Sequence, residues 1–345
     1  MAISTIEHFK YDKKDFHFVT SSENEDSKFD IVFKERWSKL EQDNILRYSV
    51  EHLEEKVLEG KYGFFAQLNI NRATNRRKPE EITSMFKPFD PNSFNFTKIL
   101  DKEVLFDIDS GNGDNIISVN VSPILWSHSL LLPQRFKCLP QQATLYSFKK
   151  AIELLLLSNS VNMRILFNSL CANASVNHLH WHFCYLNQRM FLETAPLRIL
   201  VDYLCIIEDF PSKGFCIKFL SFKEKNIDDF VAYAYKIVAY LQLNEIAHNI
   251  YITRSKSNPD KLEFDDIRIY IWARRPNYGV KNTKDFIIAA CEVFGHLPIR
   301  TQEGYDSITE EYVSKCLENV TTNIFTKVKE KLVKFLQETG GSTRE

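Results

Sequence analysis

The sequence contains no long hydrophobic run and no segment that resembles a secretion signal. Its most apolar stretches, residues 151–157 and 286–290, are far shorter than the roughly 20 residues that a membrane-spanning helix needs. Residues 1–12 lack the apolar core of a signal peptide. We therefore expect a cytoplasmic protein that has no membrane partner.

Cysteine pairs and an excess of charge are also absent. The seven cysteines are an odd number, are widely spaced and include no Cys-x-x-Cys motif, so neither a disulfide framework nor a cysteine zinc site is expected. The 44 Lys and Arg residues nearly balance the 45 Asp and Glu residues, and the formal net charge is −1. Without a global positive field we expect no nucleic acid partner, and an anionic ligand must be bound by a local basic cluster.

The composition that remains is globular, and helical and strand patterns alternate along it. Hydrophobic residues make up 44% of the chain, which is enough for a sizeable core. We expect strands at 62–71, 104–108, 116–121, 129–132, 163–167, 177–186, 200–208, 214–221, 249–254 and 266–274. We expect helices at 44–59, 141–157, 227–243, 284–294 and 309–338, a solvated loop at 20–30 and a hairpin turn at 111–114.

This mixture predicts an α+β fold built on antiparallel strands. A chain of 345 residues exceeds what a single core usually holds, so two packed halves are expected. We place the N-terminal half, which carries the motif described next, at residues 1–200 and the C-terminal half at 201–338. Residues 339–345 are expected to form a disordered tail.

Three of the nine histidines lie within five positions, in the segment His178-Leu-His-Trp-His182. Side chains on a strand alternate between its faces, so His178, His180 and His182 are expected on one side and the apolar residues between them on the other. Cys184 is expected on the apolar face, as a core residue. Three imidazoles on one face indicate a surface that meets a ligand rather than part of the core.

Imidazole is a nucleophile at neutral pH and can attack phosphorus directly. The attacking ring needs its other nitrogen bound to an acceptor, so that one tautomer persists. Ser175 and Asn177, just before the motif, are suited to bind a phosphate oxygen or a neighbouring histidine. A zinc site is the competing interpretation, but no Asp or Glu lies between Asn177 and Met190 to act as a general base or ligand, so no metal is expected.

The motif and several surrounding segments resemble one family. The string Ser175-Val-Asn-His-Leu-His-Trp-His182 resembles the signature of the histidine-triad superfamily of nucleotide hydrolases and transferases. The segments 67–71, 89–98, 120–123, 174–180, 247–254, 271–275 and 291–298 are similar to the animal GDP-D-glucose phosphorylases, which are related to the plant GDP-L-galactose phosphorylases and the galactose-1-phosphate uridylyltransferases. The resemblance covers about residues 44–315. Ser127-His128 departs from the Gly-His of many triad proteins, which puts the tightness of that turn in question.

The resemblance implies a function and a set of site residues. It implies that His180 attacks the GMP portion of GDP-glucose and that inorganic phosphate then releases GDP, with His178 and His182 as orienting groups. It also implies a triad-type antiparallel sheet with flanking helices, present twice in the chain, and no cofactor. The phosphates require local positive charge, for which the candidates are Arg76, Arg77, Lys78 and Arg274.

Two alternatives remain open at the level of sequence. A hydrolase of nucleotide sugars or dinucleotides would use water in the second step, and a non-catalytic guanine-nucleotide-binding protein would keep the pocket without needing a nucleophile. The physiological sugar, the strictness of the guanine preference and the oligomeric state do not follow from the sequence.

Overall fold

A computed structural model describes residues 6–77, 80–108, 111–222, 226–278 and 286–340. Within these residues eleven strands form one sheet, in the order β1-β4-β5-β6-β8-β7-β12-β13-β11-β10-β9. All neighbours in it are antiparallel except β1 and β4. In chain order, the first six strands of this sheet are β1 (His8–Phe9), β4 (Val104–Ile108), β5 (Ile116–Val119), β6 (Ser129–Leu132), β7 (Met163–Asn168) and β8 (Trp181–Tyr185). The other five are β9 (Leu197–Val201), β10 (Leu204–Ile207), β11 (Phe215–Lys218), β12 (His248–Ser255) and β13 (Asp266–Ala273).

The strand order repeats within the chain, as the family resemblance implied. The order β4-β5-β6-β8-β7 in the first half corresponds to β9-β10-β11-β13-β12 in the second. Helix α3 (Leu145–Leu157) lies between β6 and β7 in the chain, and α4 (Ile227–Leu243) lies between β11 and β12. The two units join edge to edge where β7 pairs with β12. The α+β fold with a duplicated antiparallel sheet is therefore confirmed.

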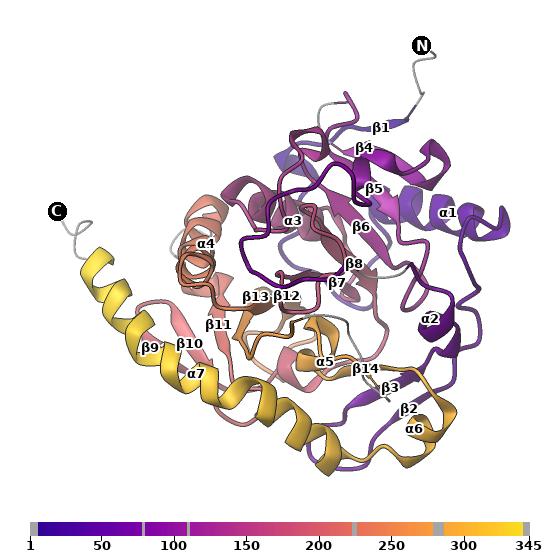
Figure 1. Cartoon of the computed structure of the whole chain (residues 1–345). Coiled ribbons are helices and arrows are strands. Elements are labelled where there is room, and N and C mark those ends of the chain that lie inside the picture. The colour runs from indigo at the N-terminus through magenta and orange to yellow at the C-terminus, as the bar shows by residue number, and fades with distance from the viewer. Residues whose placement is uncertain (1–5, 78–79, 109–110, 223–225, 279–285, 341–345) are drawn as a thin grey trace.

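The two faces of the sheet are covered differently. Helices α1 (Lys28–Gln42), α3 and α4 and the C-terminal part of α7 (Glu310–Gly340) contribute to the larger hydrophobic core on one face. The other face packs against α5 (Ala290–Phe294), the N-terminal part of α7 and a small sheet. Figure 1 shows α7 running along one side of the molecule, from the region of α6 to that of α4.

The small sheet brings distant segments of the chain together. Its strands are ordered β14-β3-β2, with β14 (His296–Ile299) parallel to β3 (Phe65–Leu68) and β2 (Glu55–Val57) antiparallel to β3. The short helices α2 (Ile70–Thr74) and α6 (Gln302–Ser307) follow β3 and β14. Because of this pairing, residues near 72 and near 300 lie at one end of the molecule, which matters for the site below.

Several expected elements are wrong or shifted. The helix expected at 44–59 is absent from this fully described segment, where the structure has irregular backbone and the short strand β2. Helix α1 begins at Lys28, inside the expected loop at 20–30, because Ser27 and Asp30 form a capping box. The strand expected at 62–71 is split into β3 and α2. The strand expected at 200–208 is divided between β9 and β10, where Asp202 has a positive φ of 48°.

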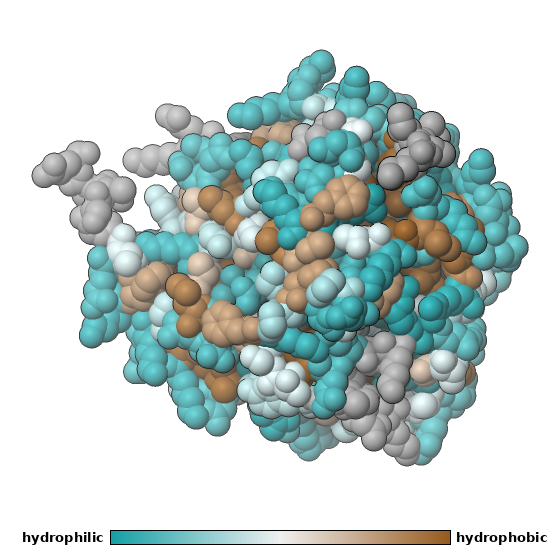
Figure 2. All heavy atoms as spheres, turned by 45° about the horizontal axis from the view of Figure 1, so that its top comes forward, coloured by the Kyte–Doolittle hydropathy of each residue, from teal (hydrophilic) through white to brown (hydrophobic). Residues whose placement is uncertain are grey.

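The chain ends in the expected long helix. Helix α7 includes Thr339 and Gly340, and residues 341–345 lie outside the described part. No helix in the described ranges combines the length and the apolar composition that crossing a bilayer requires. The face of the molecule in Figure 2 is mostly hydrophilic, with smaller hydrophobic areas between the polar side chains.

Candidate active site

The histidine motif enters strand β8 from a short loop. The strand begins at Trp181, so His178 and His180 precede it, although the sequence suggested a strand from 177. The alternation still holds, because Leu179, Trp181 and Phe183 belong to the helix-covered core. Cys184 is buried in a hydrophobic core, as expected, but the expected face was wrong: it lies two residues after His182, on the same face, and lines the cavity beside that histidine.

His180 is held in one tautomer by its own loop. Its Nδ1 lies 2.7 Å from the carbonyl oxygen of His178, and a carbonyl can only accept, so Nδ1 carries the proton. In the neutral ring the lone pair is then on Nε2, which is the nucleophilic nitrogen of this tautomer. The imidazole packs on Phe96 at a ring distance of 4.9 Å, and His180 as a whole is buried. This is the arrangement that a nucleophilic imidazole needs.

Gln141 fixes the backbone of His180 on both sides. Its side-chain oxygen accepts a hydrogen bond from the His180 N–H at 2.8 Å, and its amino group donates to the His180 carbonyl at 3.0 Å. Asn177 in turn accepts a bond from the Gln141 N–H at 3.0 Å and donates to the carbonyl groups of Lys87 and Pro88. Asn177 therefore lies behind the nucleophile, where it orders the loop, and does not line either cavity described below.

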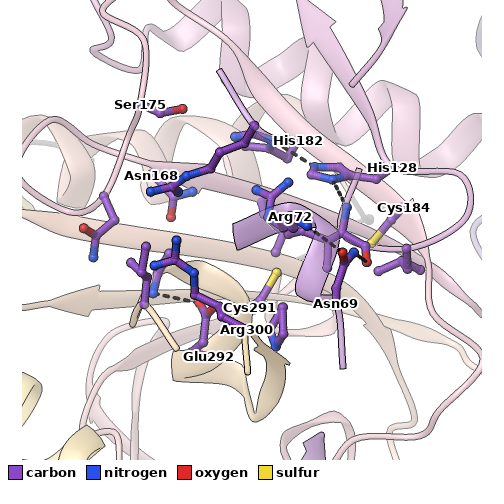
Figure 3. A pocket seen from close by; sticks show the side chains of 18 residues that line it. Asn69, Arg72, His128, Asn168, Ser175, His182, Cys184, Cys291, Glu292 and Arg300 are labelled. Atoms are coloured by element: carbon purple, nitrogen blue, oxygen red, sulfur yellow. Dashed lines mark hydrogen bonds between the residues drawn. The ribbon is translucent and has the colours of Figure 1, made fainter. Parts of the chain in front are cut away.

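His182 is oriented by a second histidine. The Ile124 N–H donates to Nδ1 of His128 at 2.9 Å, so the proton of neutral His128 is on Nε2, which lies 3.0 Å from Nδ1 of His182. Burial and the charge of Arg72 hold the pKa of His128 well below its usual range, which keeps this ring neutral. His182 thus accepts at Nδ1, and its own donor is Nε2 (Figure 3).

His178 has a structural environment. It is buried, and its Nδ1 accepts a hydrogen bond from the Phe96 N–H at 3.0 Å. The ring also packs against Phe89 and Phe96. Burial lowers the pKa of His178 to about 4, so it is neutral near pH 7. Its contacts attach the segment around Phe89–Phe96 to the histidine motif.

Two cavities meet at this motif. The first, here called the triad cavity, has both apolar and polar walls and is lined by His180, His182, Arg77, Phe96, Ile99, Glu103, Val119, Asn120, Val121, Leu130 and Val176, among others. The second, here called the arginine cavity, is lined by His128, His182, Asn168, Asn173, Cys184, Cys291, Glu292 and Arg300, among others (Figure 3). The side chains that line both are Arg72, Arg76, Ser175 and His182.

Three guanidinium groups line the arginine cavity. Burial, followed by the charges of Arg300 and Arg72, lowers the pKa of Arg76 to about 10. Burial and the charge of Arg72 also lower the pKa of Arg300. Mutual repulsion in a partly buried position is unfavourable unless an anion is bound, so the arrangement suits a phosphate dianion. Arg72 is fixed by a hydrogen bond to the carbonyl oxygen of Ser122.

The other predicted basic residues are placed differently. Arg77 lines the triad cavity, and its guanidinium lies 3.2 Å from the ring centroid of Phe94. Arg274 is buried outside both cavities and donates to Asn249 at 3.2 Å and to the carbonyl oxygen of Ile288. It therefore supports the wall of the arginine cavity that Ile287 and Ala289 form. Lys78 lies outside the described residues.

Sequence reasoning missed the residues that come from distant segments. Arg72 lies four residues before Arg76 in the chain but was not predicted, whereas Glu292 and Arg300 lie more than a hundred residues after the triad. Glu292 is buried in a wall of the cavity, and burial raises its pKa to about 7. His128 drew attention in the sequence only because Ser127 precedes it where many triad proteins have glycine. Ser127 has a positive φ of 75°, so the tight turn that glycine would favour is formed here by serine.

A metal site is the competing interpretation of the histidine motif. Among the described residues, no group of three His, Cys, Asp or Glu side chains is arranged to hold a metal ion. The imidazoles of the motif are instead bound to protein groups: His178 to a backbone N–H, His180 to a carbonyl oxygen and His182 to His128.

Both halves of the chain match models of one protein family. The model described as "GDPGP1-like, N-terminal domain" matches residues 28–184, and the model described as "GDPGP1-like, C-terminal domain" matches residues 201–339. GDP-D-glucose phosphorylase 1 of Danio rerio is 39% identical over 303 residues, which are 85% of this chain and 86% of that protein. The Homo sapiens protein of the same name is 35% identical, over 82% of this chain and 77% of that protein.

More distant similarities extend to plants and yeast. GDP-L-galactose phosphorylase 2 of Arabidopsis thaliana is 29% identical, over 83% of this chain and 70% of that protein. The crystal structure of the yeast Ap4A phosphorylase Apa2 superposes with a TM-score of 0.63 at 14% identity, over 86% of this chain and 94% of that one. At this identity the similarity concerns the fold, which the two proteins share.

Proposed function

The chain belongs to the GDPGP1-like family, and on this basis we propose that it cleaves GDP-D-glucose with inorganic phosphate to give GDP and glucose 1-phosphate. Relatives that carry the name GDP-D-glucose phosphorylase 1 cover most of this chain at 33–39% identity. The enzyme is then a nucleotidyltransferase that works through a covalent GMP-histidine. No cofactor is part of the proposed reaction.

In the first step Nε2 of His180 attacks the phosphorus that carries guanosine. A P–N bond forms, the bond from that phosphorus to the bridging oxygen breaks, and glucose 1-phosphate leaves with the bridging oxygen. In the second step an oxygen of inorganic phosphate attacks the same phosphorus. The P–N bond breaks, GDP leaves and His180 is restored. The two displacements are chemically alike, so one set of positive groups can stabilise both transition states.

The observation that carries the proposal is the tautomer of His180. Its Nδ1 proton is bound to the carbonyl oxygen of His178 at 2.7 Å, and Gln141 holds the backbone on either side, so Nε2 is presented as a nucleophile without any rearrangement. We assign orienting roles to His178 and His182, and phosphate contacts to Ser175, Arg76 and Arg77. Each of these side chains except His178 lines the triad cavity.

The arginine cavity supports phosphate, rather than water, as the second nucleophile. Arg72, Arg76 and Arg300 provide more positive charge than a bound water requires, and two of them, Arg72 and Arg76, line both cavities together with His182. A phosphate dianion held there is close to the guanylylated histidine and is oriented by bidentate donors. We propose that this cluster binds the phosphate of glucose 1-phosphate in one direction and inorganic phosphate in the other.

The test is turnover of GDP-glucose with and without inorganic phosphate, with GDP, GMP and glucose 1-phosphate measured separately. The proposal predicts GDP and glucose 1-phosphate in equal amounts, and only when phosphate is present. Formation of GMP at the same rate without phosphate would identify a hydrolase instead. The His180→Ala variant should lose at least about 10⁴-fold in rate while still binding GDP-glucose; full activity of that variant would refute a nucleophilic role.

We also propose a cytoplasmic location and a division of the chain near residue 200. All seven cysteines are free thiols in the structure, which supports a reducing compartment. The two repeats of the strand order and the two family models support halves at 1–200 and 201–338.

A further inference from the structure

We propose that Glu292 is the residue that recognises the hexose, by accepting hydrogen bonds from the sugar hydroxyl groups in the arginine cavity. This inference rests on the proposed function, because it assigns the sugar side of the same reaction. It places the nucleoside in the triad cavity, which has apolar side chains such as Phe96, Ile99 and Val176 in its lining, the phosphate at the arginines, and the hexose at a carboxylate.

Glu292 lies in the wall of the arginine cavity. The residue is only 6% exposed, yet it belongs to the lining of the arginine cavity. In Figure 3 it lies on the side contributed by the C-terminal half, opposite Ser175 and His182. A group that leaves the phosphorus at His180 and passes His182 therefore meets the wall that contains Glu292.

The Glu292 carboxylate is held by a hydrogen bond from the backbone. Its Oε2 accepts a bond from the Ala289 N–H at 2.7 Å, which caps the start of α5. This bond fixes the side chain and commits one of its two oxygens. Because Glu292 lines the cavity and each carboxylate oxygen can accept more than one hydrogen bond, the side chain also offers acceptor sites at the cavity wall, and sugar hydroxyl groups are donors that match them.

The charge of the Glu292 side chain also indicates which part of the substrate it meets. Glu292 contributes no positive charge, and in its ionised form it repels a phosphate dianion, so it does not suit the phosphate group that the three arginines bind. It suits a neutral ligand rich in hydroxyl groups, held next to that phosphate. Asn168 lies in the same cavity, and its side-chain oxygen already accepts bonds from Asn249 and Ala290, so its amino group is the donor that it offers. An acceptor and a donor at one wall are typical of a sugar site.

Burial of this carboxyl has an electrostatic cost, which the charges of Arg72 and Arg274 offset only in part. Burial raises the pKa of Glu292 to about 7. A glutamine would cap α5 equally well, because glutamine serves at the same position of a capping box. Titratable groups with strongly shifted pKa values are concentrated at functional sites.

The test compares Glu292→Gln with the wild type on two guanylyl donors, GDP-glucose and the p-nitrophenyl ester of GMP. The glutamine can keep the bond to the Ala289 N–H and presents an amino group to the cavity, so it replaces the acceptor by a donor. We expect kcat/KM for GDP-glucose to fall by about 30- to 100-fold. Release of nitrophenol should change by less than about 3-fold, because that donor has no sugar. An exposed substitution in α7, Glu311→Gln, is the matched control.

A binding measurement separates this inference from the proposed function. Titration calorimetry with glucose 1-phosphate and with inorganic phosphate should show tighter binding of the sugar phosphate by the wild type, and Glu292→Gln should lose that difference. Absence of phosphorolysis with this preference intact would refute the proposed function and leave the sugar site standing. Equal affinity of the wild type for the two ligands, or equal loss on both guanylyl donors in Glu292→Gln, would overturn the role of Glu292.

Discussion

His128 and His182 form a relay in which each ring sets the tautomer of the next. The Ile124 N–H binds Nδ1 of His128, and Nε2 of His128 faces Nδ1 of His182 at 3.0 Å. The donor of His182 is therefore directed away from the relay, and the position of His182 in the lining of both cavities makes it available to a phosphoryl oxygen. His128 itself does not line the triad cavity that contains His180, so we regard it as a positioning residue.

This relay predicts a difference between two substitutions of His128. His128→Phe removes both hydrogen bonds and should lower kcat by about 10- to 100-fold with a smaller change in KM. His128→Gln can accept from the Ile124 N–H and donate to His182, so it should recover most of the lost rate. Steady-state kinetics on GDP-glucose measure both. Equal losses in the two variants would show that the ring is needed for packing rather than for its proton.

The raised pKa of Glu292 predicts a pH-dependent stability. The folded protein holds the proton up to about pH 7, whereas the unfolded chain releases it near 4.5, so stability falls as the pH rises through this window. Glu292→Gln removes that loss and should stabilise the protein by up to about 3 kcal/mol at pH 8.5, and by much less at pH 5. Urea unfolding at the two pH values measures this. A difference between the proteins that does not change with pH would contradict the assignment.

At the scale of residues, the sequence identified those members of the site that lie close together in the chain. The triad, Ser175 and the adjacent loop arginines lie within or beside recognisable motifs, and the structure places His180, His182, Arg76 and Arg77 around the triad cavity. The residues that were missed reach the site only through tertiary structure. Arg300 is brought to Arg72 by the parallel pairing of β14 with β3, and no spacing in the sequence indicates a contact of that kind.

At the scale of elements, α1 depends on one buried carboxylate. Asp30 is fully buried and accepts hydrogen bonds from Ser158 Oγ at 2.6 Å, the Asn159 N–H at 2.8 Å and Tyr185 Oη at 2.5 Å. It also accepts from the Ser27 N–H at 3.0 Å as part of the capping box. One side chain thus joins the start of α1 to the end of α3 and to the end of β8, the strand that follows the nucleophile.

Asp30→Ala should therefore be strongly destabilising. Several buried donors lose their acceptor, and we expect a loss of about 3–5 kcal/mol in the free energy of unfolding. Asp15 is the matched control, because it also closes a capping box but on an exposed turn, and Asp15→Ala should cost about 1 kcal/mol or less. Denaturant unfolding measures both. A loss below about 1 kcal/mol for Asp30→Ala would contradict this account of α1.

One cause explains why sequence patterns failed to predict some elements. Residues 44–59 have helical spacing of apolar side chains, yet Tyr48 and Val50 pack into the main core from irregular backbone, and residues 55–57 pair with β3. Tertiary pairing has overridden the local pattern. The helix at 227–243 was predicted with its observed bounds because its buried side chains recur at helical spacing, and the short, largely apolar strand at 129–132 was also predicted with its observed bounds.

At the scale of the whole molecule the two halves share one sheet and one site. Strands β7 and β12 pair from Arg164 with Thr253 to Asn168 with Asn249, so the sheet is continuous across the junction. The arginine cavity takes His182 from the first half and Glu292 from the second. Neither half can therefore complete the site alone.

We expect the full chain to unfold in one transition, with activity lost in parallel. A fragment of residues 1–200 would expose the edge of β7 and lose the packing of α4 and α7, so it should aggregate and be inactive. Calorimetry of the full chain, with residual activity measured after each temperature, tests this. Two separate transitions, or phosphorolysis by the fragment, would show that the halves are independent units.

The covalent intermediate is the most direct test of the central claim. The protein is mixed with GDP-glucose in the absence of phosphate, quenched in alkali, digested and examined by mass spectrometry for a guanylyl group on the peptide that contains His178–His182. We predict one guanylyl group per chain, located on His180, together with an equal amount of glucose 1-phosphate, and its conversion to GDP when phosphate is added before the quench. Phosphate-dependent turnover without such an adduct, or with the adduct on another residue, would contradict the mechanism.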